Sequence, residues 1–332
     1  MKILFLFLMQ INLSVAAQTV KILAGGTKTS LRGLSVVNDK IIWASGSNGM
    51  VIRSIDGGNS WKWFTVKNFE KIDFRDIEAF DSSTAIIMGV ASPAYILKTM
   101  DGGQTWRVVY ENKSPAIFLD AMDFRDDLNG IVIGDPINNK FFVAQSIDGG
   151  NSWNDIPLQN LPPADSGEAC FAASGTNIRL LAKERIYFVS GGLKSKLFFK
   201  TRSINLPILQ GKESTGANSL AIKNKKTFII VGGDFKTPDS TLGNCVITTN
   251  SGKTWRAPAV APHGYRSCVE YLSEKKWISC GLNGVDYSND EGKTWQWIYK
   301  ESFHVCRKAK KGNAVFFAGE DGKIGKMERS PL

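Results

Sequence analysis

An eight-residue polar segment that ends in tryptophan recurs along this chain at an almost regular interval. It reads SIDGGNSW at 54–61 and 146–153, TMDGGQTW at 99–106, TTNSGKTW at 248–255 and SNDEGKTW at 288–295. The five tryptophans are 45, 47, 102 and 40 residues apart, so the third interval spans two periods. A period of about 40 to 50 residues predicts an array of similar supersecondary units. KTRSIN at 200–205 is the expected remnant of a further copy.

Each of these segments, called boxes below, is suited to a turn between two strands. The Asp or Asn side chain accepts hydrogen bonds from nearby backbone N–H groups, glycine adopts positive φ angles, and Ser or Thr adds a second side-chain bond. Tryptophan then begins the next strand and offers a large apolar surface to a neighbouring unit. We therefore assign structural roles to Asp56, Trp61, Asp101, Trp106, Asp148, Trp153, Asn250, Trp255, Asp290 and Trp295.

The box resembles the Asp box, or BNR repeat, of the sialidase-like propellers. The arrangement of the whole chain resembles the bacterial proteins related to the photosystem II stability and assembly factor. This resemblance covers almost all of the chain after residue 17, and it implies a β-propeller whose boxes lie at the periphery, between the third and fourth strands of each blade. Asp boxes occur in hydrolases, lectin-like proteins and scaffolds, so the resemblance implies a fold more than a function.

The units can be aligned on three short strands that precede each box, as in LRGLSVV, IIWASG and MVIRS of the first unit. The last unit ends after GKIGKM, one strand short, and TVKILA at 19–24 is expected to supply the missing strand. Closure of the ring in this way removes an exposed sheet edge. We predict an all-β fold with residues 18–332 in a single seven-bladed β-propeller of four-stranded antiparallel blades, whose units start near Leu31, Phe74, Leu119, Gly167, Ala217, Tyr265 and Phe303.

Residues 1–17 have the pattern of a secretory signal peptide, with Lys2, an apolar run and small residues at Val15 and Ala17. We expect cleavage after Ala17 and export of the protein to the periplasm or the extracellular space. No later segment reaches about 18 consecutive apolar residues, so the mature chain is expected to be a soluble monomer without a transmembrane segment.

The second position of every first strand is polar or ionisable. Since the first strand of a propeller blade is innermost, these side chains are predicted to point toward the central channel at the face where the strands begin. One interpretation is a set of ion pairs that neutralise one another inside the channel. The other, which we favour, is a binding site for a carboxylate or phosphate, because three arginines exceed two acids. The seven residues are Arg32, Arg75, Asp120, Glu168, Asn218, Arg266 and His304.

The loops between second and third strands are expected to open on the same face. They differ in length, and variable loops on a rigid scaffold often carry function. Tyr95, Asp135 and Asp234 lie in or beside these loops and are further candidates for ligand binding. Asp before Pro, as at position 135, is also a common turn residue.

Two function classes follow. The favoured class is a binding or assembly module that recognises an anionic group on a protein or a glycan. The alternative is a sialidase-like exo-glycosidase acting on acidic sugars, with Glu168 and Asp120 as candidate catalytic carboxylates. Sialidases have six units and an Arg-Ile-Pro or Arg-Leu-Pro motif, whereas this chain has seven units and reads LRGL. An enzyme is therefore the less favoured interpretation.

Signatures for metals and cofactors are not evident. The chain has only two histidines, His263 and His304, and neither an HExxH motif nor a Cys/His cluster with metal-ligand spacing. No GxGxxG motif opens a helix, so we expect no nucleotide cofactor. Among the five cysteines, Cys268 and Cys280 are placed symmetrically about Glu274 in a hairpin, and whether they form a disulfide is left open.

The formal net charge is +10, and lysines gather in the turns KNKK at 223–226, SEKK at 273–276 and KAKK at 308–311. Solvated lysine-rich turns are the simplest interpretation, and an acidic partner is the alternative. Export and the lack of a groove-reading element argue against nucleic acid as a partner.

Overall fold

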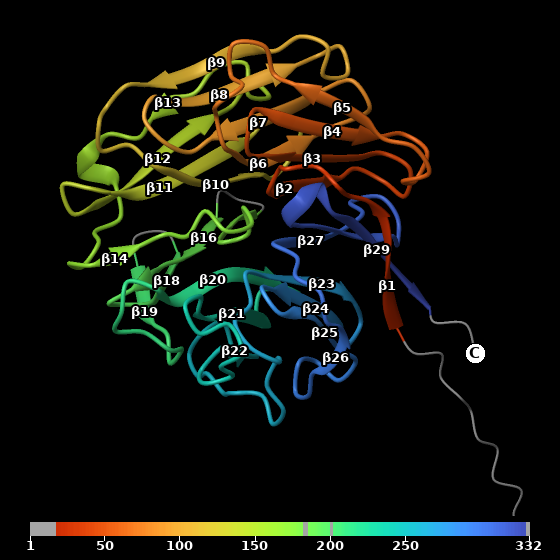
Figure 1. Ribbon diagram of the computed structural model, residues 1–332. Helices are drawn as coiled ribbons and strands as arrows, with labels where there is room; N and C mark the ends of the chain where they lie inside the picture. Colours follow the sequence, from red (N-terminus) through yellow and green to blue (C-terminus); the bar gives the residue numbers. More distant parts are fainter. Residues whose placement is uncertain (1–17, 182–184, 200–201, 330–332) are drawn as a thin grey trace, which may run out of the picture.

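The computed structural model describes residues 18–181, 185–199 and 202–329 and shows a seven-bladed β-propeller (Figure 1). The predicted signal peptide, at 1–17, lies outside the described residues, as do the first two residues of the predicted KTRSIN remnant. In this part of the chain no helix is long and apolar enough to span a bilayer. The predicted fold class is confirmed.

Blades 1 to 3 are regular antiparallel sheets whose strands follow chain order from the channel outward. Their inner strands begin at the predicted residues. Blade 1 comprises β2 (Leu31–Val36), β3 (Ile42–Gly46), β4 (Met50–Ser54) and β5 (Lys62–Thr65). Blade 2 comprises β6 (Phe74–Ala79), β7 (Ala85–Gly89), β8 (Ala94–Thr99) and β9 (Arg107–Asn112). Blade 3 comprises β10 (Leu119–Phe124), β11 (Gly130–Ile137), β12 (Lys140–Ser146) and β13 (Asn154–Asp155).

Blades 4 to 6 keep this order with local departures. Blade 4 comprises β15 (Ile178–Leu181), β16 (Arg185–Val189), β18 (Lys196–Phe199) and β19 (Arg202–Asn205). Blade 5 comprises β20 (Thr215–Ile222), β21 (Phe228–Asp234) and β22 (Cys245–Thr248), and its outermost position is a single bridge between Ile247 and Arg256. Blade 6 comprises β23 (Cys268–Ser273), β24 (Lys276–Gly281), β25 (Gly284–Ser288) and β26 (Gln296–Tyr299).

Blade 7 closes the ring with both ends of the described chain. It comprises β27 (Val305–Lys308), β28 (Val315–Ala318), β29 (Ile324–Arg329) and the N-terminal strand β1 (Gln18–Ala24). Strand β1 pairs antiparallel with β29, with Val20 opposite Met327 (Figure 1). The predicted closure by the N-terminal strand is confirmed, and it satisfies the backbone groups of β29 that would otherwise face solvent.

The boxes are turns between the third and fourth strands, held by their own side chains. In blade 1 the carboxylate of Asp56 accepts hydrogen bonds from the Ser60 N–H (2.9 Å) and hydroxyl (2.5 Å). These bonds lower the pKa of Asp56 to about 2. Blade 7 needs no box because its third and fourth strands lie at opposite ends of the chain. In blade 4, β19 begins at Arg202 soon after β18, so no box intervenes.

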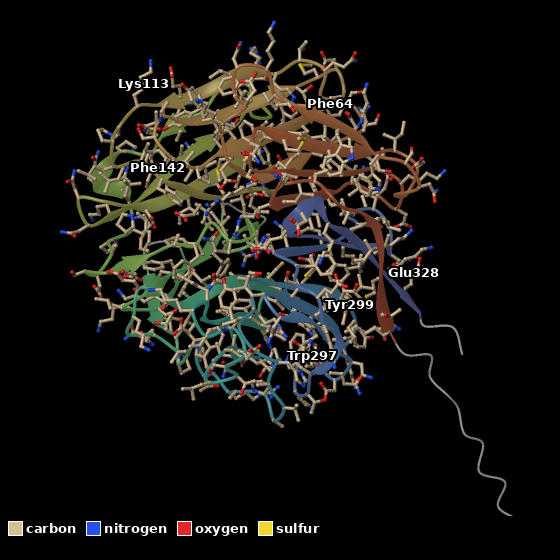
Figure 2. All side chains as sticks on the ribbon, in the orientation of Figure 1. Phe64, Lys113, Phe142, Trp297, Tyr299 and Glu328 are labelled. Carbon is tan, nitrogen blue, oxygen red and sulfur yellow. The ribbon has the colours of Figure 1, made fainter. Side chains whose placement is uncertain are left out.

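Each box tryptophan packs against the preceding blade. Trp106 of blade 2 packs against a core cluster that includes Trp43 and Val51 of blade 1, and Trp153 of blade 3 belongs to a cluster that includes Ile86 of blade 2. The same holds for the box tryptophans of blades 1, 5 and 6. Side chains fill the space between neighbouring blades (Figure 2), so the tryptophans join units that cannot bury their apolar faces alone.

Candidate functional site at the channel mouth

The seven polar residues predicted to face the channel are called the polar ring below, and a β-bulge near the start of the inner strand positions several of them. Leu31 and Gly33 of β2 pair with successive residues of β3, and Arg32 between them has no partner. A bulge re-aims the side chain of the extra residue. This explains how a polar side chain reaches the channel from a strand whose other residues are buried. The same offset leaves one residue unpaired in each of β6, β10 and β20, namely Arg75, Asp120 and Asn218.

Glycine at the end of the second strand permits this bulge. A Cβ on Gly46 would lie 2.3 Å from the carbonyl oxygen of Ser30, the residue before β2. In blade 3 a Cβ on Gly134 would lie equally close, 2.3 Å, to the carbonyl oxygen of Phe118. Two strands therefore approach so closely at the mouth that no side chain fits between them.

The inner strand of blade 4 departs from the predicted pattern. Its first part, β14 (Glu168–Ala169), begins next to the predicted start at Gly167 and pairs with β17 (Gly191–Gly192). The chain then leaves the ladder for residues 170–177 before it resumes as β15. We call residues 170–177 the plug. Cys170 is the first residue of the plug and is buried.

The plug crosses the central channel and contacts the inner strands of other blades. It is held by hydrogen bonds from Ser174 Oγ to the Ser267 carbonyl (2.7 Å), Thr176 Oγ1 to Ser219 Oγ (2.6 Å), and Arg307 Nη2 to the Gly175 carbonyl (3.0 Å). Part of the plug lines an upper cavity, where the inner strands begin, and a second, lower cavity lies where they end.

The upper cavity has a volume of about 430 Å³ and brings together five of the predicted site residues. Arg32 and Arg75 come from neighbouring blades, and Arg75 pairs with Asp73 at 2.7 Å. In the described chain, Arg32 has no carboxylate within 4.0 Å, and its Nη1 donates a hydrogen bond to the Ala173 carbonyl at 3.4 Å. The other three are Asp135, Asn218 and His304.

Burial and positive charge set the protonation of two cavity residues. Burial, followed by the charge of Arg75, lowers the pKa of Arg32, although guanidinium remains protonated at ordinary pH. Burial, followed by the charges of Arg32 and Arg75, lowers the pKa of His304 to about 3. His304 is therefore a neutral imidazole, and its Nε2 lies 3.0 Å from the Ser30 hydroxyl. Arg32 and Arg75 are thus the cations that line the cavity.

Two carboxyl groups lie close to this cavity. Asp135 lines it and accepts a hydrogen bond from the Cys170 N–H at 2.9 Å, while burial raises its pKa to about 6. Asp120 is completely buried, and burial together with the charge of Asp135 raises its pKa well above the usual range. Asp120 therefore favours the protonated form and adds little negative charge.

Two other ring members are directed elsewhere. Arg266 is fully buried, where its Nε donates to Asp286 at 2.7 Å and its Nη1 donates to the Tyr265 carbonyl at 2.8 Å. Glu168 accepts hydrogen bonds from the Ser190 hydroxyl and from Lys196 Nζ at 3.1 Å. Both groups are paired within the fold, and neither lines the upper cavity.

The loop candidates Tyr95 and Asp234 also lie outside the lining of the upper cavity. Tyr95 packs edge-on against Phe69, with 5.0 Å between ring centroids. Asp234 is buried and accepts a hydrogen bond from the Lys236 N–H at 2.9 Å. Burial favours a higher pKa for Asp234, but this hydrogen bond, the Ser214 hydroxyl and Lys212 together lower it.

An aromatic wall of the cavity was missed by the sequence analysis. Phe171 and Phe235 have ring centroids 6.0 Å apart, and Phe235 and Tyr265 have centroids 6.3 Å apart. Tyr265 also donates to Asn218 Oδ1 at 2.8 Å. Tyr265 immediately precedes Arg266 of the polar ring, and Phe235 immediately follows the loop candidate Asp234. Their positions in the sequence could therefore have indicated that they lie near the cavity. Phe171 lies in the plug, for which no repeat offered a template.

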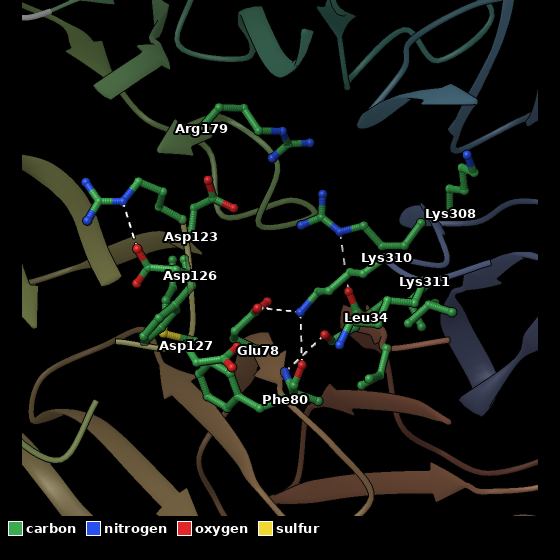
Figure 3. A pocket seen from close by; sticks show the side chains of 18 of the residues that line it. Leu34, Glu78, Phe80, Asp123, Asp126, Asp127, Arg179, Lys308, Lys310 and Lys311 are labelled. Atoms are coloured by element: carbon green, nitrogen blue, oxygen red, sulfur yellow. Dashed lines mark hydrogen bonds and ion pairs between the residues drawn. The ribbon is translucent and has the colours of Figure 1, made fainter. Parts of the chain in front are cut away.

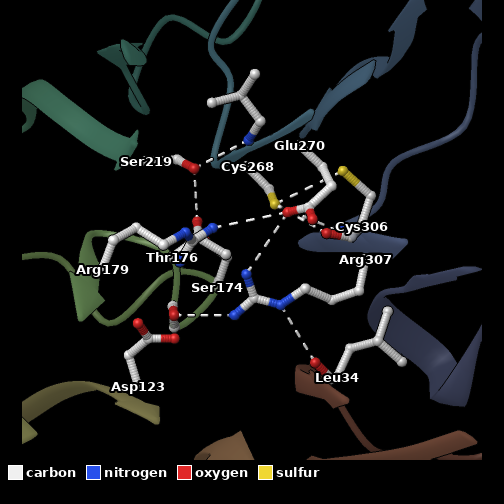
Figure 4. Close-up of polar contacts among 12 residues, drawn as sticks. Leu34, Asp123, Ser174, Thr176, Arg179, Ser219, Cys268, Glu270, Cys306 and Arg307 are labelled. Atoms are coloured by element: carbon white, nitrogen blue, oxygen red, sulfur yellow. Dashed lines mark hydrogen bonds and ion pairs between the residues drawn. The ribbon is translucent and has the colours of Figure 1, made fainter. Parts of the chain in front are cut away.

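The lower cavity, of about 420 Å³, contains charges that neutralise one another (Figure 3). Lys310 pairs with Glu78. Glu270 lies 3.7 Å from Arg179 and 3.9 Å from Arg307 (Figure 4). Burial raises the pKa of Glu270, and the two arginines oppose this shift. The lower cavity is therefore better described as a network of internal ion pairs, whereas the upper cavity has a guanidinium available for a ligand.

No protein-family model matches this chain, and no curated protein matches it by sequence. Solved structures do resemble it. YCF48 bound to a D1 peptide superimposes with a TM-score of 0.65 at 15% identity, over 96% of this chain and 99% of that protein. YCF48 from Cyanidioschyzon merolae also gives 0.65 at 15% identity, over 93% and 98% of the two chains.

An enzyme shares the same fold. The GH74 xyloglucanase from Xanthomonas campestris superimposes with a TM-score of 0.61 at 13% identity, over 93% of this chain but only 53% of that protein. At such low identities these likenesses establish the propeller fold, which hosts binding proteins and hydrolases alike.

Proposed function

We propose that this propeller is a binding module that holds an anionic group of a partner polypeptide in the upper cavity. The observation that carries the proposal is Arg32, a cavity-lining guanidinium beside Arg75 that has no carboxylate partner in the described chain. Guanidinium groups bind carboxylates through paired hydrogen bonds, which are strong where water is partly excluded.

The aromatic wall favours a polypeptide as the source of this anionic group. Phe171, Phe235 and Tyr265 provide apolar surface next to the arginines, so a carboxylate and an adjoining apolar side chain would be bound together. YCF48, which has a similar fold over nearly the whole chain, has been solved with a bound peptide. The C-terminal carboxylate of a polypeptide combines these features.

Fluorescence anisotropy with labelled peptides tests the proposal. Peptides with apolar C-terminal residues and a free carboxylate are expected to bind at least about tenfold more tightly than the matching C-terminal amides. The double variant Arg32→Gln/Arg75→Gln should lose this difference. Arg125→Gln is a matched control because Arg125 pairs with Asp126 at 2.9 Å in the lower cavity. Equal binding of carboxylates and amides by the wild type would overturn the proposal.

A hydrolase remains the second candidate, and one observation favours it. Asp135 lines the upper cavity with a pKa raised to about 6, suitable for a general acid. A paired-carboxylate mechanism needs a second acid about 5 to 9.5 Å away. Asp120 and Glu168, the expected pair, do not line this cavity. Turnover of acidic oligosaccharides that Asp135→Asn abolishes would support the hydrolase, and binding without turnover would support the module.

A further inference from the structure

Three cysteines from two neighbouring blades meet in the hydrophobic core between blades 6 and 7. Cys268 lies on β23, Cys280 lies opposite it on β24, and Cys306 lies on β27 of the next blade. Their three sulfur atoms all lie within 4.8 Å of one another, and the Cys268 and Cys306 sulfurs are 3.6 Å apart (Figure 4). All five cysteines of the chain are free thiols, so the sulfurs are available as ligands.

The spacing matches a metal site with three sulfur ligands. Three sulfurs that surround a metal in a plane at about 2.3 Å are about 4.0 Å from one another. The observed limit of 4.8 Å therefore requires only a small contraction of side chains that are already in place. The site is not evident from the sequence, because the three cysteines are not in a short metal-binding motif and meet only through the pairing of β23 with β24 and the contact between blades 6 and 7.

We propose that Cys268, Cys280 and Cys306 form a buried site for a soft, monovalent d¹⁰ metal ion, namely Cu(I). Thiolates select soft metals such as Cu(I). A structural zinc site would need a fourth ligand, and within the described chain no other His, Cys, Asp or Glu joins the group. The three cysteines are 0% exposed, so water is not at hand to complete a tetrahedral zinc site. A site with only three sulfur ligands and no water therefore favours Cu(I) over zinc.

The charges around the cluster are compatible with thiolate ligands. The Cys306 N–H lies 3.4 Å from the Cys268 sulfur, and the guanidinium of Arg307 is near enough to stabilise a thiolate at Cys268. Two thiolates, one thiol and Cu(I) carry a net charge of about −1, which the adjacent guanidinium can balance.

The binding step balances without an electron donor. Cu(I) enters as Cu(I), two S–H bonds break, three Cu–S contacts form, and two protons leave to solvent. Glu270 and Arg307, which lie two residues after Cys268 and one residue after Cys306, line the lower cavity (Figure 4).

Anaerobic titration of the reduced protein with Cu(I) in the presence of a competing chromogenic chelator tests the inference. We expect one Cu(I) per folded chain, an ultraviolet thiolate-to-copper charge-transfer band, and one bound copper by native mass spectrometry. Cys268→Ser and Cys306→Ser should each lose this equivalent. Cys170→Ser and Cys245→Ser are matched controls, because these two thiols are buried but lie outside the cluster, and both should retain it.

The wild type alone is sufficient to refute the inference, even if a cluster variant fails to fold. Failure of the folded wild type to compete for Cu(I) better than the same chain unfolded in urea would overturn it, because a site built by the fold must disappear on unfolding. Copper binding that is equal in folded cluster variants and in the wild type would overturn it too. So would a disulfide between any two of the three cysteines in protein isolated from its native compartment.

Discussion

The guanidinium of Arg307 in β27 donates a hydrogen bond of 3.0 Å to the carbonyl oxygen of Gly175 in the plug. The same side chain donates to the Leu34 carbonyl of blade 1 at 3.3 Å and lies 3.9 Å from Glu270 of blade 6. One partly buried cation therefore connects the plug to three blades. This arrangement holds the plug in place, and part of the plug lines the upper cavity together with Arg32 and Arg75.

Replacement of Arg307 should loosen the plug before the rest of the propeller. In Arg307→Met the Gly175 carbonyl loses its hydrogen bond and Glu270 loses one of its two arginines, and we expect the free energy of unfolding to fall by about 2 kcal/mol. Amide hydrogen exchange measured by mass spectrometry should rise most in residues 170–177. Arg125→Met removes only an exposed pair and should cost less than about 1 kcal/mol. Unchanged exchange in the plug would contradict this role for Arg307.

The close approach of backbone at the bulge predicts an unusual sensitivity to a single methyl group. In Gly46→Ala the new Cβ meets the Ser30 carbonyl oxygen at 2.3 Å, so the strands must separate. We expect a loss of about 2 kcal/mol in urea unfolding, as for other overpacked sites. Gly25→Ala is the control, since its nearest neighbours lie at 3.8 Å, and it should change stability by less than about 0.5 kcal/mol. Equal effects of the two substitutions would exclude a steric role for Gly46.

His304 should make stability depend on pH on the acid side. The folded protein lowers its pKa to about 3, whereas the unfolded chain protonates histidine near 6.5. Between these values the unfolded state binds the extra proton, so the free energy of unfolding falls as pH falls from about 6.5 toward 3. Urea unfolding at pH 7 and pH 5 should show a steeper loss for the wild type than for His304→Asn. Parallel losses would mean that other groups account for the acid sensitivity.

Ring closure predicts a cost for disrupting the N-terminal strand. Val20 is 5% exposed and faces the core of blade 7, whereas Lys21 beside it points outward and lies 3.9 Å from Glu328. Val20→Asp should cost about 3 kcal/mol by burying an unpaired charge, and should promote association through the exposed edge of β29. Lys21→Gln should be nearly neutral. Thermal unfolding with light scattering compares the two, and a monomeric Val20→Asp with wild-type stability would contradict closure by β1.

In blade 4 the sequence repeat predicts the position of the unit but not the plug. The repeat period correctly placed a unit there, and β14 does begin next to Gly167. The plug could not be anticipated, because a template drawn from the other units contains no segment that leaves the sheet. Its position depends on partners such as Ser267 and Ser219, which belong to blades later in the chain.

In the polar ring, the sequence repeat predicts equivalent positions but not which side chains reach the upper cavity. Arg32, Arg75 and Arg266 occupy equivalent positions in their units, but only the first two line the upper cavity. The difference is Asp286 on β25, which pairs with Arg266 inside blade 6. Equivalent positions in a repeat share a backbone direction, whereas the direction of a long side chain depends on which charge lies within its reach.

The sequence by itself determined the number of units, the turns between their outer strands and the closure of the ring by β1. These features rest on short-range chemistry, such as Asp56 accepting hydrogen bonds from Ser60, and such chemistry is visible in every copy of the repeat. Only the tertiary structure decided that the plug contacts the inner strands of other blades, that Arg32 has no carboxylate partner within the described chain and that Cys268 meets Cys306. Those contacts join separate blades, and their geometry depends on the packing of the ring as a whole.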